Sequence, residues 1–331
     1  MTYWMISNRE VNGKGANRSL GLSEGDLTYW TTDRQTGLTK LSAWTDVSAK
    51  AFREALIGAA QAFPEFADPA DQEEQKHVTL FIHGYNNSWT DAVERYQQIA
   101  DDMFSGRDGL GLCILFTWPS DGLKSAYYPD RLEARRSADE LAEVLTTLYD
   151  YLVLQQDAAM RTGQPTCRAK VSVIAHSMGN FVLQKALQHV WTRRNQPLLV
   201  SMINQLLMVA ADVDNDLFKG GEGVDKTDGD AITNLTYRVT ALYSGLDSVL
   251  GVSAGLKHFG KRRLGRSGLD RNETPPDNVW DIDCSKYLKN LPKGMPNTHS
   301  AYFEVTKIQA LMADILRGVD RQVILARHGL P

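Results

Sequence analysis

Several features that would assign a protein to a particular class are scarce or missing in this sequence of 331 residues. Its three cysteines, Cys113, Cys167 and Cys284, are far apart and include no Cys-x-x-Cys pair, so neither a zinc ribbon nor a dithiol site is indicated. At least one thiol stays unpaired in a monomer, which favours a reducing, cytoplasmic location. Since no apolar run approaches the roughly 18 residues of a transmembrane helix, we expect no membrane span. The N-terminus also lacks the basic and apolar regions of an export signal.

An excess of charge of one sign is missing as well. The chain has 36 basic and 40 acidic residues, a formal net charge of -4, which provides no overall attraction to nucleic acid or to anionic lipid. No internal repeat and no low-complexity tract is found. The composition therefore indicates a globular protein without a nucleic-acid partner, and it carries no information about the oligomeric state. The length suits one large α/β domain, residues 1–331, better than two independent domains.

The order of hydrophobic patterns indicates the fold class. Apolar runs typical of buried strands cover residues 77–82, 112–118, 169–175, 205–211, 237–243 and 279–284. Helical spacing of apolar residues is seen at 48–63, 92–103, 134–152 and 180–191 and from residue 300 onward. Because strands and helices alternate from residue 77, the sequence predicts a mostly parallel central sheet with helices on both faces.

Four local expectations accompany this fold. The aromatic and polar pattern of residues 2–33 predicts short antiparallel strands at a sheet edge. Ser88 and Asp91 are spaced as a helix capping box. We expect Tyr127 to Pro129 to form a loop before the long helix. An acidic, Gly-rich loop is expected to reach Asp230, with room for a small cap at most.

The most informative stretch is Val171 to Asn180, where a strand-like run breaks at Ser177 before a helix. A serine on so sharp a turn needs small residues two positions before and after it, here Ala175 and Gly179. Ala175 replaces the commoner glycine and adds only one methyl group. The pattern therefore predicts a nucleophile elbow with Ser177 as the nucleophile.

A serine hydroxyl becomes a good nucleophile only when a histidine accepts its proton. His299 follows the last predicted strand and precedes the last helix, which is where an α/β hydrolase carries its base. His258 competes with it, but no strand precedes His258. His83 and His176 adjoin the other motifs, and we interpret both as supporting residues of the site.

Two aspartates compete for the role of the acid that orients the base. Asp247 comes a few residues after the 237–243 strand, and Asp212 directly follows the 205–211 strand. We favour Asp247 because the later strand more often carries the acid in this fold. Asp212, Asp214 and Asp216 alternate like the start of a calcium loop, but Leu217 stands where such a loop needs glycine, so we interpret them as a solvated loop with a helix cap.

Position along the chain and charge predict two further features, an oxyanion hole and a basic loop. The oxyanion hole should be formed by the backbone N–H of Met178 and by that of Tyr85, or alternatively Asn86, after the 77–82 strand. The loop 257–266 carries five basic residues, Lys257, Lys261, Arg262, Arg263 and Arg266. We interpret it as a solvated flexible loop, with contact to an anionic part of a substrate as the alternative.

In combination, these motifs resemble an uncharacterised bacterial family of α/β hydrolases, described mainly as serine esterases or as a domain of unknown function. The resemblance spans nearly the whole chain and rests on Ser7-Asn8-Arg9-Glu10, Ile82-His83-Gly84-Tyr85-Asn86-Asn87, Thr117-Trp118-Pro119-Ser120, Ala175-His176-Ser177-Met178-Gly179-Asn180, Tyr243-Ser244-Gly245-Leu246-Asp247 and His299-Ser300-Ala301-Tyr302-Phe303.

The resemblance implies an α/β-hydrolase fold with Ser177, Asp247 and His299 as the triad and with no metal or organic cofactor. It divides the single domain into N-terminal edge strands and a helix (1–70) and a catalytic core (77–318). The expected function is a serine esterase that cleaves a small-molecule carboxylic ester through an acyl-enzyme. Alternatives are an acyltransferase or thioesterase on the same triad, or a non-catalytic scaffold.

Overall fold

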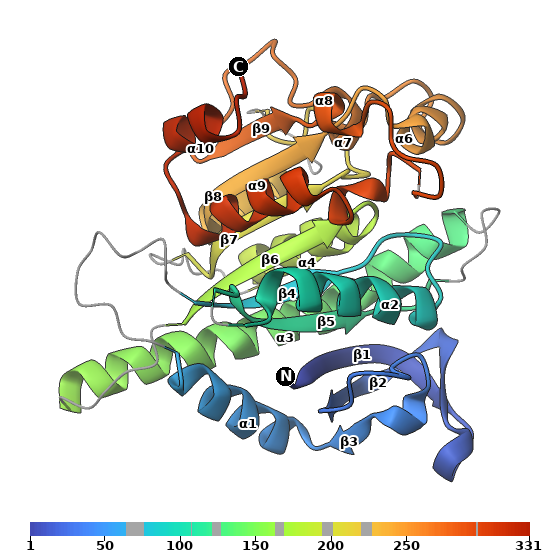
Figure 1. The fold of residues 1–331 in the computed structure, drawn as a ribbon, viewed down its shortest axis with the longest axis vertical. Coiled ribbons are helices and arrows are strands. Elements are labelled where there is room, and N and C mark those ends of the chain that lie inside the picture. The colour runs from blue at the N-terminus through green and yellow to red at the C-terminus, as the bar shows by residue number, and fades with distance from the viewer. Residues whose placement is uncertain are drawn as a thin grey trace.

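The structure is a computed structural model, and it describes residues 1–63, 76–106, 108–120, 127–162, 169–193, 201–219, 227–295 and 297–331. Over these residues nine strands form one sheet in the order β3-β2-β1-β5-β4-β6-β7-β8-β9 (Figure 1). The strands are β1 (Tyr3–Asn12), β2 (Ser19–Thr32), β3 (Thr45–Val47), β4 (His77–Ile82), β5 (Gly111–Thr117), β6 (Lys170–His176), β7 (Ile203–Val209), β8 (Thr236–Tyr243) and β9 (Val279–Asp283).

All neighbouring strands from β1 to β9 along this order pair in parallel, whereas β2 is antiparallel to both β1 and β3. The prediction of a mostly parallel sheet is therefore confirmed. Each residue of β4 is buried, because helices cover both faces of the sheet at this strand. A strand buried on both faces can be apolar without alternating with polar residues. The carboxyl ends of β4, β6, β8 and β9 lie at the same edge of the sheet, where the loops with the candidate residues begin.

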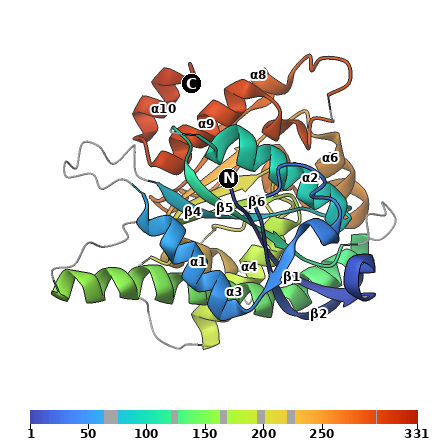
Figure 2. The ribbon, with the colours of Figure 1, turned by 60° about the horizontal axis from the view of Figure 1, so that its bottom comes forward.

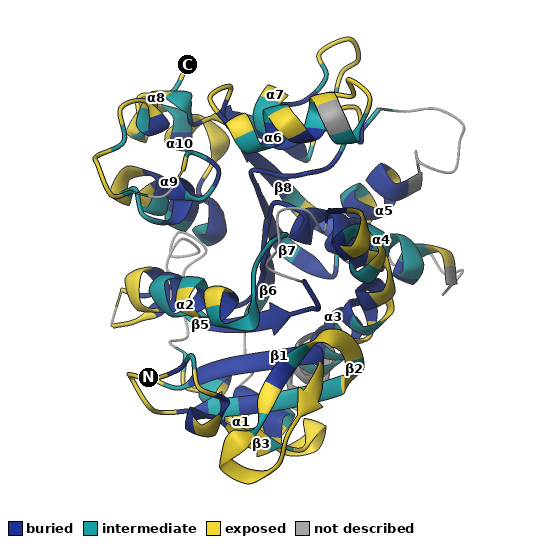
Figure 3. Cartoon of the chain, turned by 90° about the vertical axis from the view of Figure 1, so that its right-hand side faces the viewer, coloured by how far each residue is buried: buried dark blue, intermediate teal, exposed yellow. Residues whose placement is uncertain are grey.

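Helices cover both faces of the sheet, as the sequence predicts (Figure 2). Within the described ranges they are α1 (Ala49–Gln61), α2 (Trp89–Ile99), α3 (Tyr127–Thr162), α4 (Gly179–Arg193), α5 (Thr227–Leu235), α6 (Ser248–Val252), α7 (Leu264–Ser267), α8 (Ser285–Leu288), α9 (Thr306–Arg317) and α10 (Arg321–Arg327). Figure 3 shows the buried strands between the two helical layers. None of the helices in the described ranges combines the length and the apolar character needed to cross a bilayer.

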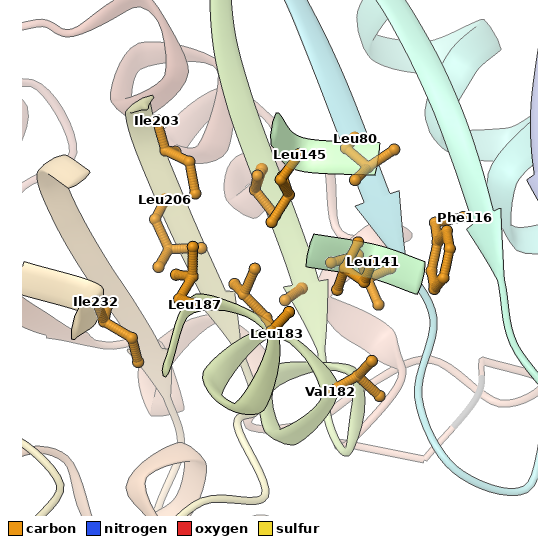
Figure 4. Close-up of a cluster of buried hydrophobic side chains, with 14 of the residues drawn as sticks. Leu80, Phe116, Leu141, Leu145, Val182, Leu183, Leu187, Ile203, Leu206 and Ile232 are labelled. Atoms are coloured by element: carbon orange, nitrogen blue, oxygen red, sulfur yellow. The ribbon is translucent and has the colours of Figure 1, made fainter. Parts of the chain in front are cut away.

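The pleat of each central strand divides its side chains between two apolar cores. In β4, Leu80 and Ile82 belong to the core under α1, α3, α4 and α5, whereas Phe81 belongs to the core under α2, α8, α9 and α10. Figure 4 shows the first core, in which Leu141 of α3 and Leu183 of α4 lie against the strands. Packing in these two cores fixes the positions of the strands whose carboxyl ends lead into the candidate residues.

The capping box of α2 is present, since the Ser88 hydroxyl accepts from the Asp91 N–H and the Asp91 carboxylate accepts from the Ser88 N–H. The antiparallel pairing expected within residues 2–33 is present between β1 and β2. Neither strand is the edge strand, however, because β2 lies between β1 and β3, and β1 lies between β2 and β5. The first half of β1 is apolar and fully buried, so it can pair on both sides. Both strands are also long, at 10 and 14 residues.

Of two stretches expected to be loops, one is entirely helical and the other is partly helical. Tyr127 and Pro129 lie in the first turn of α3, where proline is tolerated because its missing N–H would have no partner there. The acidic stretch up to Asp230 contains the start of α5, whose first turn carries Asp228 and Asp230, a favourable position for negative charge. Residues 220–226 of the small cap expected there lie outside the described residues.

Candidate active site

Ser177 occupies the turn between β6 and α4 with φ of +52°, a conformation that non-glycine residues adopt rarely. Such a backbone costs on the order of 1–3 kcal/mol and persists only when its surroundings hold it. Here the Ser177 N–H donates to the carbonyl of Val209 at 3.0 Å, and the Ser177 carbonyl accepts from the N–H of Asp212 at 3.1 Å. The elbow is thus held by the residues at and after the end of β7.

The small residues around the turn have identifiable steric roles. A Cβ on Gly179 would lie 2.5 Å from the carbonyl oxygen of His83, so no larger residue fits there without displacing backbone. A Cβ on Gly84 would lie 2.7 Å from the Cβ of Ser177. The loop after β4 therefore approaches Ser177 through a glycine. Ala175 is fully buried in β6, where its methyl group is accommodated.

A chain of two hydrogen bonds joins Ser177, His299 and Asp247. The Nε2 atom of His299 lies 2.8 Å from the Ser177 Oγ, and its Nδ1 lies 2.7 Å from the Asp247 Oδ2. Ser177 and His299 retain 4% and 8% of their accessible surface, and Asp247 retains none. The structure thus brings together three candidate residues that are far apart in the sequence, in the geometry needed to move a proton from serine to histidine.

The loop after β8 holds the Asp247 carboxylate in place. Asp247 is the N-cap of α6, and its Oδ1 accepts a hydrogen bond from the Leu250 N–H at 2.9 Å, which leaves Oδ2 for His299. The Arg266 guanidinium donates to the Asp247 carbonyl oxygen. Both carboxylate oxygens are therefore engaged, which fixes the rotation of the group that orients the imidazole.

The side chain of His176 contacts the backbone of the candidate base, His299. Its Nε2–H donates to the His299 carbonyl oxygen at 3.0 Å, and the two imidazole centroids are 5.0 Å apart. Burial and the neighbouring His299 lower the pKa of His176 well below its ordinary value, so the ring stays neutral. It therefore positions the backbone of the candidate base and adds no charge beside it.

The loop proposed from the sequence to carry an oxyanion donor is extensively hydrogen-bonded. The Asn87 side-chain amide donates to the carbonyls of Gly84 and Tyr85 at 3.0 and 2.9 Å. The His83 ring stacks on Trp118, with 5.3 Å between centroids, and its Nδ1–H donates to the Gly84 carbonyl at 2.9 Å. Among the described residues no acceptor is found for the N–H of Met178. A backbone N–H without an acceptor, placed next to Ser177, is suited to bind a developing negative charge.

Arg9 is a buried cation that sequence reasoning identified only as part of a resemblance motif. Its Nε–H donates to the Thr117 Oγ1 at 3.0 Å, and Thr117 is in turn 3.1 Å from the His83 Nε2. Its two terminal nitrogens donate to the carbonyls of Gly21, Ser120 and Asn87 at 3.1 to 3.4 Å. Arg9 thus ties β2, the segment after β5 and the loop after β4 to one rigid group.

Asp212 lies next to the elbow, but its carboxylate belongs to a separate network. It accepts from the Tyr127 hydroxyl at 2.8 Å, the Ser253 hydroxyl at 3.0 Å and the Arg263 Nε–H at 2.7 Å. Burial alone would raise the pKa of Asp212, but Arg263, the Tyr127 hydroxyl and Arg131 outweigh it and lower the pKa. The solvated loop expected for Asp212 is therefore wrong, because this carboxylate is buried and paired.

His258 also belongs to this network, since its Nε2 is hydrogen-bonded to the Tyr127 hydroxyl. Burial, followed by the charge of Arg263, lowers the pKa of His258 to about 4. The structure thus places His258 against Tyr127 and Asp212, whereas His299 is the histidine next to Ser177.

The solvated loop expected for residues 257–266 is wrong for three of its five cations, because Lys257 is half-buried beside two tyrosine rings and two arginines are bonded within the protein. Arg263 is fully buried and forms ion pairs with Asp212 and Asp214, and Arg266 is bonded to the backbone of Asp247. Arg262 and Lys261 are exposed. The sequence could not distinguish these positions, because burial of a cation depends on which carboxylates the fold brings near it.

A pocket of about 840 Å³ opens at this edge of the sheet. Its described lining includes His299, His176, Gly84, Tyr85, Val249 and Lys257. This volume lies within the range of about 300 to 1,000 Å³ found for small-molecule sites. The pocket therefore offers room for a substrate beside the Ser177–His299 pair.

The comparisons with known proteins agree with this architecture. The family model described as "Alpha/beta hydrolase of unknown function (DUF900)" matches residues 59–313. A curated relative, "Uncharacterized protein alr1448" from Nostoc sp. (strain PCC 7120), is 26% identical over 303 residues, covering 74% of this chain and 75% of the relative.

Solved structures of low similarity include Aspergillus fumigatus lipase B, at 12% identity with a TM-score of 0.43, and a Pyrobaculum calidifontis esterase, at 10% identity with a TM-score of 0.34. The matches cover 77% and 82% of this chain. The chain spans 57% of the length of the lipase and 93% of that of the esterase. At such low TM-scores no functional conclusion follows from these two.

Proposed function

Because the chain belongs to the α/β hydrolase family of unknown function (DUF900), we propose that it is a serine hydrolase that cleaves carboxylic esters through an acyl-enzyme. One observation carries this proposal: the hydrogen-bonded chain from Ser177 through His299 to Asp247. Each member has one role in the reaction, as nucleophile, general base and orienting acid respectively.

In the first half of the reaction, His299 Nε2 accepts the hydroxyl proton of Ser177 while Oγ bonds to the ester carbonyl carbon. The carbonyl oxygen becomes an oxyanion, and the N–H groups of Met178 and Tyr85 are its proposed donors. Collapse of this intermediate breaks the bond to the alcohol oxygen. His299 returns the proton to that oxygen, and the alcohol leaves.

In the second half, a water molecule gives a proton to His299 and bonds to the acyl carbon of the acyl-enzyme. The second tetrahedral intermediate then releases the carboxylic acid, and His299 returns its proton to Ser177. Throughout, the buried Asp247 carboxylate keeps the Nδ1–H of His299 directed toward itself and stabilises the imidazolium.

The pocket supports a small-molecule substrate. Its volume of about 840 Å³ suits a small molecule, and its lining mixes Val249 and Tyr85 with polar groups near His299. We further propose that residues 1–331 act as one α/β-hydrolase domain, since β1, β2 and β3 extend the same sheet and Arg9 bonds to the loop after β4.

The proposal is tested with a fluorophosphonate probe and a chain-length series of p-nitrophenyl esters. Wild-type protein should be labelled and should hydrolyse at least one ester, whereas Ser177→Ala should do neither. Loss of a triad serine typically costs on the order of a million-fold in kcat, more than partial unfolding could produce. Ser23→Ala, in the exposed part of β2, is the matched control and should keep both activities. An unlabelled wild type would support the non-catalytic scaffold instead.

A further inference from the structure

Lys257 lines the same pocket as His299, and its ammonium group lies near two tyrosine rings. Its Nζ lies 3.9 Å from the ring centroid of Tyr127 and 5.0 Å from that of Tyr85. The two rings are 5.4 Å apart and nearly perpendicular to one another. The aromatic faces attract the ammonium group and hold it at the pocket wall, but a ring face offers it no conventional hydrogen-bond acceptor.

The ammonium group of Lys257 has no anionic partner among the described residues. Other basic side chains of this region are paired: Lys261 with Asp214 at 3.3 Å and Arg263 with Asp212 at 2.7 Å. Burial lowers the pKa of Lys257, although the more distant Asp212 and Asp130 oppose this shift. A partly dehydrated ammonium with three free donors binds an incoming anion better than a fully hydrated one does.

The other charges of the pocket limit what this anion can be. Arg95, the second Lys or Arg side chain of the described lining, already pairs with Glu304 at 3.1 Å. Asp91 and Glu94 also line the pocket and would repel additional negative charge. One available ammonium matches one negative charge, which suits a carboxylate better than a phosphate group with its charge of about -1.5 to -2.

We propose that Lys257 binds a carboxylate of the substrate, so that the preferred substrates are esters that carry one negative charge in the acyl or the alcohol portion. This inference rests on the proposed esterase function and assigns its substrate class. Lys257 is then a specificity residue that touches the substrate but takes no part in proton transfer. Among the five basic residues of the 257–266 loop, Lys257 is then the one that contacts the anion.

The test compares matched ester pairs by proton release at constant pH. Monomethyl adipate and methyl hexanoate differ by a terminal carboxylate on the acyl side, and hexanoylglycolate and ethyl hexanoate differ in the same way on the alcohol side. For at least one pair, wild-type kcat/KM should favour the anionic ester. Lys257→Met should reduce that preference by about 10- to 100-fold, the usual contribution of a hydrogen bond to a charged group.

Two variants separate recognition of charge from general damage. Lys257→Arg keeps the cation and should retain most of the preference, whereas Lys257→Gln should lose it as Lys257→Met does. The matched control is Lys261→Met, an exposed lysine of the same loop that does not line the pocket. Its preference should equal that of the wild type. The ratio within each variant cancels any common loss of folded protein.

The inference is overturned if wild type prefers the neutral ester of both pairs, or if Lys257→Met leaves both ratios unchanged. Either result leaves the esterase proposal intact, since hydrolysis itself is then observed. If wild type hydrolyses none of these esters and also resists the fluorophosphonate probe, the proposed function fails, and the inference fails with it.

Discussion

The Asp212 N–H donates a hydrogen bond to the Ser177 carbonyl at 3.1 Å, yet the Asp212 carboxylate is bonded to Arg263 and not to His299. The acid nearest to the elbow along the sheet edge is thus committed to a structural ion pair. Asp247, which follows the next strand β8 and caps α6, has one carboxylate oxygen bonded to His299. The carboxylates of Asp212 and Asp247 therefore have different partners, although both residues lie near Ser177.

Substitution of the two aspartates should separate these duties. Asp247→Asn should lower kcat by roughly four orders of magnitude with little loss of fold, because an amide cannot hold the reactive tautomer of His299. Asp212→Asn should act mainly on stability, because it removes one of the two carboxylates that pair with the buried Arg263 guanidinium and leaves only Asp214, at a cost of up to about 3 to 5 kcal/mol. Urea unfolding and ester hydrolysis of both variants measure this. A larger kcat loss in folded Asp212→Asn would exchange the assignments.

The pH profile should identify the base. His299 must be neutral to accept the Ser177 proton, so kcat/KM should rise with pH as this group loses its proton. His299→Ala should remove that limb and reduce activity about as far as Ser177→Ala, since nucleophile and base act as a unit. His258 has a pKa lowered to about 4, so it is neutral across the limb, and His258→Ala should leave the limb in place. A limb that disappears in His258→Ala would assign the base to His258.

Arg9 should affect turnover through the loop after β4. Arg9→Lys keeps a charge but cannot donate at once to Thr117, Ser120 and Asn87. A small displacement of the proposed oxyanion donor Tyr85 should then lower kcat by roughly 100-fold with little change in KM. Arg18→Lys, at the partly exposed pair with Asp46, is the control. Unchanged kcat in folded Arg9→Lys, with only a lower unfolding free energy, would restrict Arg9 to a structural role.

Neighbouring arginines of the 257–266 loop should differ sharply in their effect on stability. Arg263→Met should destabilise the fold by about 3 to 5 kcal/mol, because it leaves Asp212 buried without its counter-ion. Arg262→Met should change stability by no more than about 0.5 kcal/mol, as expected for an exposed side chain. Equal shifts of the urea midpoint would contradict the burial of Arg263.

Acid should destabilise the fold through His77. Burial, Lys170 and Arg317 lower its pKa from 6.5 to about 3, so the unfolded chain binds one proton more than the folded chain between these values. The contribution of neutral His77 to the free energy of unfolding is then fully present above about pH 6.5. It decreases as the pH falls toward about 3, by at most about 1.4 kcal/mol per pH unit. His77→Val should flatten this dependence relative to wild type, while His83 and His258 continue to contribute in both proteins. Equal slopes in urea titrations at several pH values would rule out this contribution.

Much of the fold could be predicted from local patterns. The strand at 77–82 was predicted to the residue, because a buried parallel strand is apolar on both faces and ends where polar loop residues begin. The interior position of β1 could not be predicted, since its parallel pairing with β5 joins residues about 110 positions apart. The helix α5 was missed because Gly229 and the acidic residues around it are typical of a loop as well.

The sequence by itself determined the elbow, since small residues at 175 and 179 around a serine follow from sterics within a few residues. It also limited the acid and the base to two candidates each, whose catalytic roles remain predictions. Only the tertiary structure decided which aspartate lies beside His299, that Arg263 is buried, and that Lys257 lines the pocket. The physical reason is that the burial and the partners of a charged side chain depend on residues that packing brings near it. Those residues are distant in the sequence, so the local sequence does not identify them.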